Sequence, residues 1–141
     1  MGRRLGQHFL ADPGILDRIV EALDPSQSDV VIEIGAGKGT LTARLAPLVA
    51  RVIAIEKDPR LALQLRERGK GEEGRVLPGN VLVVEGDALE VDWQTLPPSR
   101  FPVPPFKVVG NIPYYITTPL IEKALTPPMP VVVVFLVQRE V

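Results

Sequence analysis

The chain has 141 residues, 45% of them hydrophobic and 23% charged, which fits one globular domain. It contains no cysteine and a single histidine, so disulfides and thiolate zinc sites are excluded and we expect no metal centre. The formal net charge of -1 excludes a global positive field, so any contact with RNA must be local. No apolar run spans a bilayer and the start lacks a secretion signal; we expect a cytoplasmic protein without membrane contact.

Strand-like and helix-like segments alternate along the chain. Apolar, mostly β-branched runs predict strands at residues 30–34, 51–55, 81–85, 107–110 and 131–137. Apolar residues at helical spacing predict helices over 13–23, which the capping pair 12–13 opens, and over 40–48. Two further helices are predicted after the capping pairs at 58–59 and 118–119. The last strand, a continuous β-branched run, is typical of strands buried on both faces. The segments 70–79 and 96–105 predict irregular connections.

This alternation predicts an α/β fold with a mostly parallel sheet and right-handed crossovers. In such sheets, ligands bind beyond the carboxyl ends of the strands. The polar or glycine residues that follow the first four predicted strands are Gly35, Gly37, Glu56, Asp87 and Asn111. We therefore expect these residues to line one ligand site.

Gly35, Gly37 and Gly39 form a turn between a strand and a helix. Glycines at such a turn let the backbone approach a ligand closely, and the next helix presents its positive end. Thr40 stands where the dinucleotide fingerprint requires its third glycine, which favours a ligand without a pyrophosphate. The alternative is a turn with a structural role alone.

Two carboxylates follow the second and third predicted strands. Glu56, nineteen residues after Gly37, is placed to accept hydrogen bonds from the vicinal hydroxyls of a ribose; the alternative is a solvated charge beside Lys57. Asp87 is placed to accept a hydrogen bond from an adenine amine, with Ala88 against the ring. For Asp87 the alternative is a cap of the next turn.

The segment Asn111-Ile112-Pro113-Tyr114 combines an amide, a rigid turn and an aromatic face. An exocyclic amine of a nucleobase is a poor nucleophile, because its lone pair is delocalised into the ring. The Asn111 side-chain oxygen and the Ile112 carbonyl could accept its hydrogens and direct the lone pair at an electrophile. Tyr114 could stack on an extruded base. The alternative is a proline turn with a packed tyrosine.

In order and spacing, these motifs resemble the ribosomal RNA adenine dimethyltransferases over essentially the whole chain. The matching segments are Gly6–Leu10, Glu33–Gly39, Glu56, Gly86–Leu89, Asn111–Leu120 and Gln138–Val141. The resemblance implies one domain over residues 1–141 with a Rossmann-like S-adenosylmethionine-dependent methyltransferase core, five parallel strands in the order 3-2-1-4-5. It implies an enzyme that converts S-adenosyl-L-methionine to S-adenosyl-L-homocysteine and dimethylates N6 of adjacent adenosines near the 3′ end of small-subunit rRNA, in ribosome biogenesis.

The resemblance also implies a role for each matching residue. Cofactor binding is carried over to His8, Leu10, Gly35, Gly37, Glu56, Asp87, Ala88 and Asn111, and handling of the target base to Asn111, Ile112, Pro113 and Tyr114. His8 and Leu10 would close over the amino-acid part of the cofactor. Glu56 would hold its ribose, and Asp87 with Ala88 its adenine.

Members of this family continue beyond the point where this chain ends, with further strands and a helical C-terminal domain. We therefore expect a fragment that binds the cofactor weakly and methylates nothing alone, a monomer whose partner is rRNA or a pre-ribosomal particle. Three alternatives remain at the level of the sequence. They are a large-subunit rRNA methyltransferase of the macrolide-resistance type, a nicotinamide-dependent oxidoreductase, and a non-enzymatic RNA-binding or transcription-factor relative.

Overall fold

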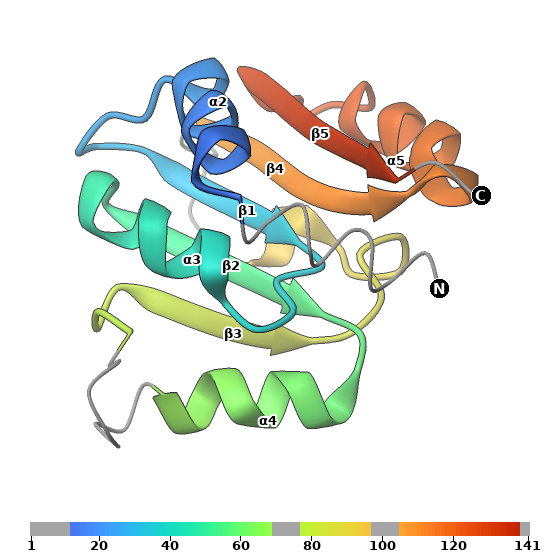
Figure 1. Cartoon of the computed structure of the whole chain (residues 1–141). Helices are drawn as coiled ribbons and strands as arrows, with labels where there is room; N and C mark the ends of the chain where they lie inside the picture. Colours follow the sequence, from blue (N-terminus) through green and yellow to red (C-terminus); the bar gives the residue numbers. More distant parts are fainter. Residues whose placement is uncertain (1–11, 69–76, 97–104, 139–141) are drawn as a thin grey trace.

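A computed structural model describes residues 12–68, 77–96 and 105–138. These residues form one parallel sheet with helices packed against it (Figure 1). Its strands are β1 (Val30–Ile34), β2 (Arg51–Glu56), β3 (Val81–Glu85), β4 (Phe106–Pro113) and β5 (Val132–Gln138). All neighbouring pairs are parallel, and their order is β3-β2-β1-β4-β5. The predicted strand order and orientation are confirmed.

Helices cover both faces of the sheet. They are α2 (Pro13–Leu23), α3 (Thr40–Leu45), α4 (Pro59–Arg68) and α5 (Thr117–Ala124), with 3-10 turns η1 (Ala46–Leu48), η2 (Trp93–Thr95) and η3 (Tyr114–Ile116). Side chains of α2 and α3 share an apolar cluster with Val31, whereas those of α5 and η2 cluster with Ile32. Successive strand residues point to opposite faces, so α2 and α3 lie on one face and α5 on the other (Figure 1).

Two of the three predicted helix caps are present. The Asp12 and Asp58 carboxylates each accept a hydrogen bond from the backbone N–H two residues further on, at 2.8 and 2.9 Å. The predicted cap at Thr118-Pro119 is wrong, because α5 begins one residue earlier, at Thr117, and no side chain caps it. The turn η3 runs directly into α5, so the chain has no extended residue there that could act as a cap.

The two last strands differ from the prediction. β4 continues through Pro113, because β5 pairs with it as far as Gln138, whereas β1 ends opposite Gly110. The prediction that the last strand is buried on both faces is wrong, since Val133 and Val137 are 38% and 40% exposed. Among the described residues β5 pairs with β4 alone, and a β-branched run does not distinguish an edge strand from a central one.

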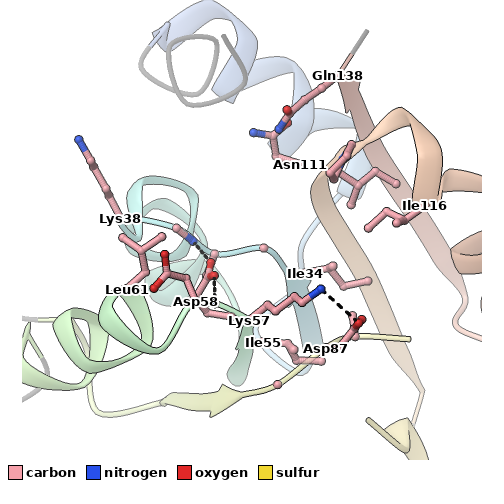
Figure 2. A pocket seen from close by; sticks show the side chains of 18 of the residues that line it. Ile34, Lys38, Ile55, Lys57, Asp58, Leu61, Asp87, Asn111, Ile116 and Gln138 are labelled. Carbon is pink, nitrogen blue, oxygen red and sulfur yellow. Dashed lines mark hydrogen bonds and ion pairs between the residues drawn. The ribbon is translucent and has the colours of Figure 1, made fainter. Parts of the chain in front are cut away.

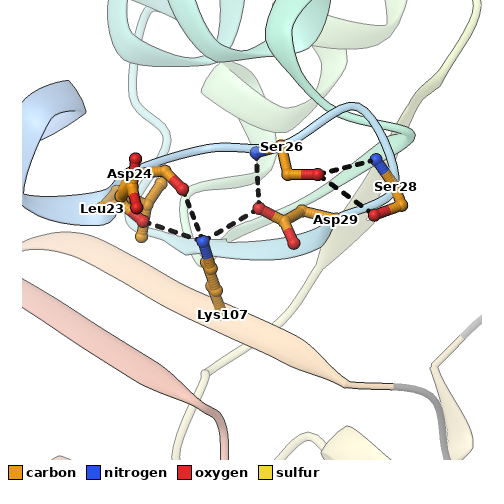
Figure 3. A network of polar contacts seen from close by, with 6 residues as sticks. All are labelled: Leu23, Asp24, Ser26, Ser28, Asp29 and Lys107. Carbon is orange, nitrogen blue, oxygen red and sulfur yellow. Dashed lines mark hydrogen bonds and ion pairs between the residues drawn. The ribbon is translucent and has the colours of Figure 1, made fainter.

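A buried lysine joins the elements at the end of the sheet where the strands begin (Figure 3). Lys107 Nζ donates to the carbonyl oxygens of Leu23 and Asp24 at 3.0 and 2.6 Å, and forms an ion pair with Asp29 at 3.0 Å. The Asp29 carboxylate also accepts the N–H of Ser26 at 2.7 Å. These contacts attach the carboxyl end of α2 to β4.

Parts of the two predicted connections, 70–79 and 96–105, lie outside the described residues. Within the described ranges, no helix has both the length and the apolar character that crossing a bilayer requires.

Candidate functional site

The turn after β1 lies directly against β4. Gly35 has a φ of 71°, in the left-handed region that favours glycine, and a Cβ at this position would lie 3.1 Å from the carbonyl oxygen of Asn111. The Gly35 N–H donates to the carbonyl of Ile55 at 2.9 Å, which attaches the turn to β2 as well. The turn thus leaves no room for a side chain between β1 and the segment that contains Asn111.

Glu56 is the last residue of β2 and is buried, with 7% of its surface exposed. Its two carboxylate oxygens accept the backbone N–H groups of Gly37 and Asp58, at 2.7 and 2.8 Å. The alternative of a solvated charge is therefore wrong. Because each carboxylate oxygen has two acceptor sites, Glu56 retains capacity for further hydroxyl donors while these contacts fix its position.

Asp87 lies two residues after β3 and caps the turn that follows it. Its Oδ1 accepts the N–H of Leu89 at 2.9 Å, and its Oδ2 lies 3.7 Å from Lys57 Nζ. The turn cap considered as an alternative is present, and it occupies only one of the two oxygens. Ala88 beside it is buried.

Asn111 lies within β4, not after it as predicted, at a position that extends past β1. Its register partner is Leu136 of β5. The Asn111 Oδ1 atom is buried and has no hydrogen-bond partner among the described residues. A buried acceptor without a donor costs about 1–3 kcal/mol, so this oxygen is suited to a donor that a ligand brings.

Two tyrosines lie at the outer end of this segment. Tyr114 and Tyr115 are 48% and 70% exposed, and their rings meet edge to face with centroids 5.8 Å apart. Exposed aromatic faces of this kind suit stacking with a flat ring.

These residues surround one cavity of about 830 Å³. Every predicted site residue within the described ranges lines it: Gly35, Gly37, Glu56, Asp87, Ala88, Asn111, Ile112, Pro113 and Tyr114. Figure 2 shows Asn111 and Gln138 on one side of the cavity and the Lys57–Asp87 ion pair on the other. His8 and Leu10 lie outside the described residues.

Some lining residues were not predicted from the sequence. Lys38 and Lys57 bring positive charge to the cavity, and Ile34, Ile55 and Ile116 give it an apolar wall. The lysines carry no distinguishing pattern in the sequence. Ile34 and Ile55 stand at the ends of predicted strands, and that position was the available signal, whereas Ile116 belongs to the turn η3, which was not predicted.

Glu33 is a buried carboxyl group that the sequence analysis did not assign to the site. It lies in β1, is 1% exposed, and accepts a hydrogen bond from the Thr42 hydroxyl of α3. Burial raises the pKa of Glu33 to about 8 against this hydrogen bond, and the charge of Glu56 adds to the rise. A charged residue inside the apolar run 30–34 was the signal that could have revealed it.

The cavity is rich in acceptors. Carboxylates of Glu56 and Asp87 and the amide oxygen of Asn111 lie around it, with apolar side chains between them. Such a site suits a ligand that carries several hydroxyl or amine donors and a flat apolar part. A nucleoside that bears an amine has this combination of groups.

The family model and the curated relatives agree on one family. The family model described as "Ribosomal RNA adenine dimethylase" matches residues 2–141. The "Ribosomal RNA small subunit methyltransferase A" of Halothermothrix orenii is 42% identical over 139 residues, which cover 97% of this chain and 44% of that protein. The chain thus spans less than half the length of this curated relative.

Two of the solved structures that are similar to the chain are rRNA or adenosine methyltransferases by name. A dimethyladenosine transferase from Plasmodium falciparum aligns with a TM-score of 0.72 and 37% identity, covering 91% of this chain and 42% of the other. The 23S rRNA methyltransferase ErmE aligns with a TM-score of 0.71 and 33% identity, covering 90% and 46%. Both similarities extend over nearly all of this chain.

Proposed function

The chain belongs to the ribosomal RNA adenine dimethylase family, and on this premise we propose that its cavity binds S-adenosyl-L-methionine for the methylation of adenine N6 in rRNA. The observation that carries the proposal is the buried Asn111 Oδ1, which has no donor among the described residues and shares one cavity with Glu56 and Asp87. A ligand with amine and hydroxyl groups would satisfy all three acceptors.

Each part of the cofactor has suitable residues in the cavity. Glu56, fixed by two backbone N–H groups, would accept the ribose hydroxyls. Asp87 would accept the adenine amine beside the buried Ala88. Gly35 and Gly37 line the cavity without side chains and would admit the amino-acid part closely, and His8 and Leu10 would close over it.

The target adenine would enter at Asn111–Tyr114. When bound, S-adenosyl-L-methionine supplies a sulfonium methyl group and leaves as S-adenosyl-L-homocysteine. Asn111 Oδ1 and the Ile112 carbonyl would accept the two hydrogens of N6 and so favour a tetrahedral nitrogen with its lone pair free to react. Tyr114 would stack on the base, a contact worth about 1–3 kcal/mol. Positioning would supply most of the rate, since no strong base is required.

We assign the substrate to small-subunit rRNA and its adjacent adenosines near the 3′ end, with rRNA or a pre-ribosomal particle as partner. The relative from Halothermothrix orenii, named for the small subunit, supports this choice at 42% identity. Asp87-Ala88-Leu89 and Thr118-Pro119-Leu120 also resemble the small-subunit branch. ErmE, named for 23S rRNA, keeps a large-subunit substrate as the second candidate at 33% identity.

The test uses the chain alone and the chain fused to the carboxyl-terminal part of the Halothermothrix orenii relative, because the alignment covers only 44% of that protein. Each is incubated with unmodified ribosomal particles and methyl-labelled S-adenosyl-L-methionine, and the rRNA nucleosides are analysed by mass spectrometry. We expect the fusion to form N6,N6-dimethyladenosine in small-subunit rRNA. Label in large-subunit rRNA would support the second candidate, and unlabelled adenine would overturn the reaction.

Asn111→Ala in the fusion separates catalysis from binding. We expect methyl transfer to fall at least about 100-fold and cofactor affinity to fall less than about tenfold, because the amide acts on the reacting nitrogen. Asn80→Ala is the matched control, since Asn80 lies outside the cavity and bonds the carbonyls of Ala46 and Val49. Equal turnover by Asn111→Ala and the unchanged protein would contradict the assignment.

A further inference from the structure

The Lys123 ammonium is held by the turn that follows β3. Its Nζ donates to the carbonyls of Ala88 and Leu89 at 2.8 and 3.1 Å, and to that of Val91. An ammonium has three N–H groups, so these carbonyls use all of them. The nitrogen also lies 5.1 Å from the centre of the Trp93 ring, within the range of a cation–π contact.

The turn held in this way forms one wall of the cavity. Ala88 lines the cavity, and its carbonyl accepts the Trp93 indole N–H at 3.1 Å in addition to the Lys123 ammonium. The Asp87 carboxylate accepts the N–H of Leu89 at 2.9 Å, so Asp87 is fixed to the same turn. A shift of the turn would therefore move Asp87 and Ala88 together.

The backbone of Lys123 belongs to the segment that contains Asn111. Lys123 lies in the last turn of α5, which follows β4 and η3 without a break. Leu120 and Ala124 of α5 share a buried cluster with Ile112 of β4 and with Ala88. Lys123 thus connects the two sides of the cavity through packed, hydrogen-bonded elements.

We propose that Lys123 is a positioning residue that fixes the Asp87–Ala88 turn where it selects a 6-amino purine over a 6-oxo purine. The inference rests on the proposed adenosyl cofactor and adds a residue that touches neither ligand. A carboxylate at a fixed place discriminates the two bases, because it accepts a hydrogen bond from the amino group and repels the oxo group. A turn released from Lys123 would still contact the ring, but without this discrimination.

The test compares two ligands that differ at this one group. Affinities of the chain for S-adenosyl-L-homocysteine and for its 6-oxo analogue, S-inosyl-L-homocysteine, are measured by calorimetry. We expect the unchanged chain to prefer the adenosyl ligand by at least about tenfold, the value of one charge-assisted hydrogen bond. Lys123→Met should reduce this preference to less than about threefold, chiefly through weaker binding of the adenosyl ligand.

Two further variants separate positioning from stability. Lys123→Arg keeps a cation and several donors, so it should recover part of the preference. Lys107→Met removes the buried lysine at the opposite end of the sheet and should lower stability without changing the preference. Melting curves establish that every variant is folded at the temperature of the titration.

The outcomes distinguish the inference from the function on which it rests. The inference alone is overturned if the unchanged chain binds the adenosyl ligand and Lys123→Met prefers it over the inosyl ligand by the same factor. An equal loss for both ligands also overturns it, since that result indicates general damage to the site. Binding of neither ligand by the unchanged chain overturns the proposed cofactor and this inference together.

Discussion

Asn111 and Glu33 each have a buried side-chain oxygen, and the two oxygens differ in whether the protein supplies a hydrogen-bond donor. Asn111 Oδ1 has no donor among the described residues, whereas the Glu33 carboxylate has the Thr42 hydroxyl as its donor. On the proposed function, a ligand would supply the donor for Asn111. Glu33 lies beneath α3 and is explained by the connection that it makes between β1 and the helix after the glycine turn.

Glu33 should make the stability of the chain depend on pH. Its pKa is about 8 in the folded chain against an ordinary value of 4.5. Between these values the folded chain keeps a proton that the unfolded chain releases. The free energy of unfolding should therefore fall as pH rises, by up to about 1.4 kcal/mol per pH unit from this group.

Glu33→Gln tests this dependence, because glutamine keeps the acceptor for Thr42 and does not titrate. Urea denaturation from pH 5 to pH 8 should show the variant gaining stability relative to the unchanged chain as pH rises. Thr42→Val is the control, since it retains the carboxyl group and should retain the slope. Parallel pH profiles for Glu33→Gln and the unchanged chain would contradict the assignment.

At the scale of elements, the site depends on where strands end and how helices are attached there. The bounds of β1 and β3 follow from their apolar runs and match the prediction. The end of β4 could not be predicted, because pairing with β5, some twenty-five residues later in the chain, carries the strand through Asn111 to Pro113. Residues at strand ends were identified by local patterns, whereas the contacts of Lys123 with residues 88–91 depend on packing between distant segments.

Gly39 should be essential to the attachment of α3 and α4. Its φ is 84°, and a Cβ there would lie 2.6 Å from both Leu65 Cδ2 and Arg68 Nη1, which itself donates to the Lys38 carbonyl at 2.5 Å. Gly39→Ala should lower the free energy of unfolding by about 1–3 kcal/mol through backbone strain, and more through the clash. Gly79→Ala, with open space at its Cβ position, should be nearly neutral in the same urea titration. Equal stabilities of the two variants would contradict this account.

The Lys107 network should contribute more to stability than a surface ion pair. Lys107→Met leaves the carbonyls of Leu23 and Asp24 and the Asp29 carboxylate, whose side chain is 17% exposed, without their cation, a loss of about 3 kcal/mol. The exposed pair of Arg44 and Asp17 is the comparison, and Arg44→Met should cost less than about 1 kcal/mol. Denaturation midpoints measure both, and similar losses would show that burial of Lys107 is unimportant.

In the whole molecule, one end of the sheet contains a network of polar contacts and the other end contains the cavity. The end where strands begin contains the Lys107 network, which attaches helices to strands (Figure 3). The end where β1, β2 and β3 finish and β4 extends beyond β1 contains the cavity (Figure 2). The near-neutral charge of the chain is consistent with a site that would recognise a ligand by local acceptors.

On the proposed function, the cavity should bind an adenosyl sulfur compound and not a dinucleotide. Titration calorimetry of the chain with S-adenosyl-L-homocysteine and, separately, with NAD tests it most directly. We predict saturable 1:1 binding of the homocysteine compound, weakened in Glu56→Gln, which loses a carboxylate oxygen that accepts a backbone N–H, and no binding of NAD at the same concentration. Tighter binding of NAD, or binding of the homocysteine compound that Glu56→Gln leaves unchanged, would contradict the account.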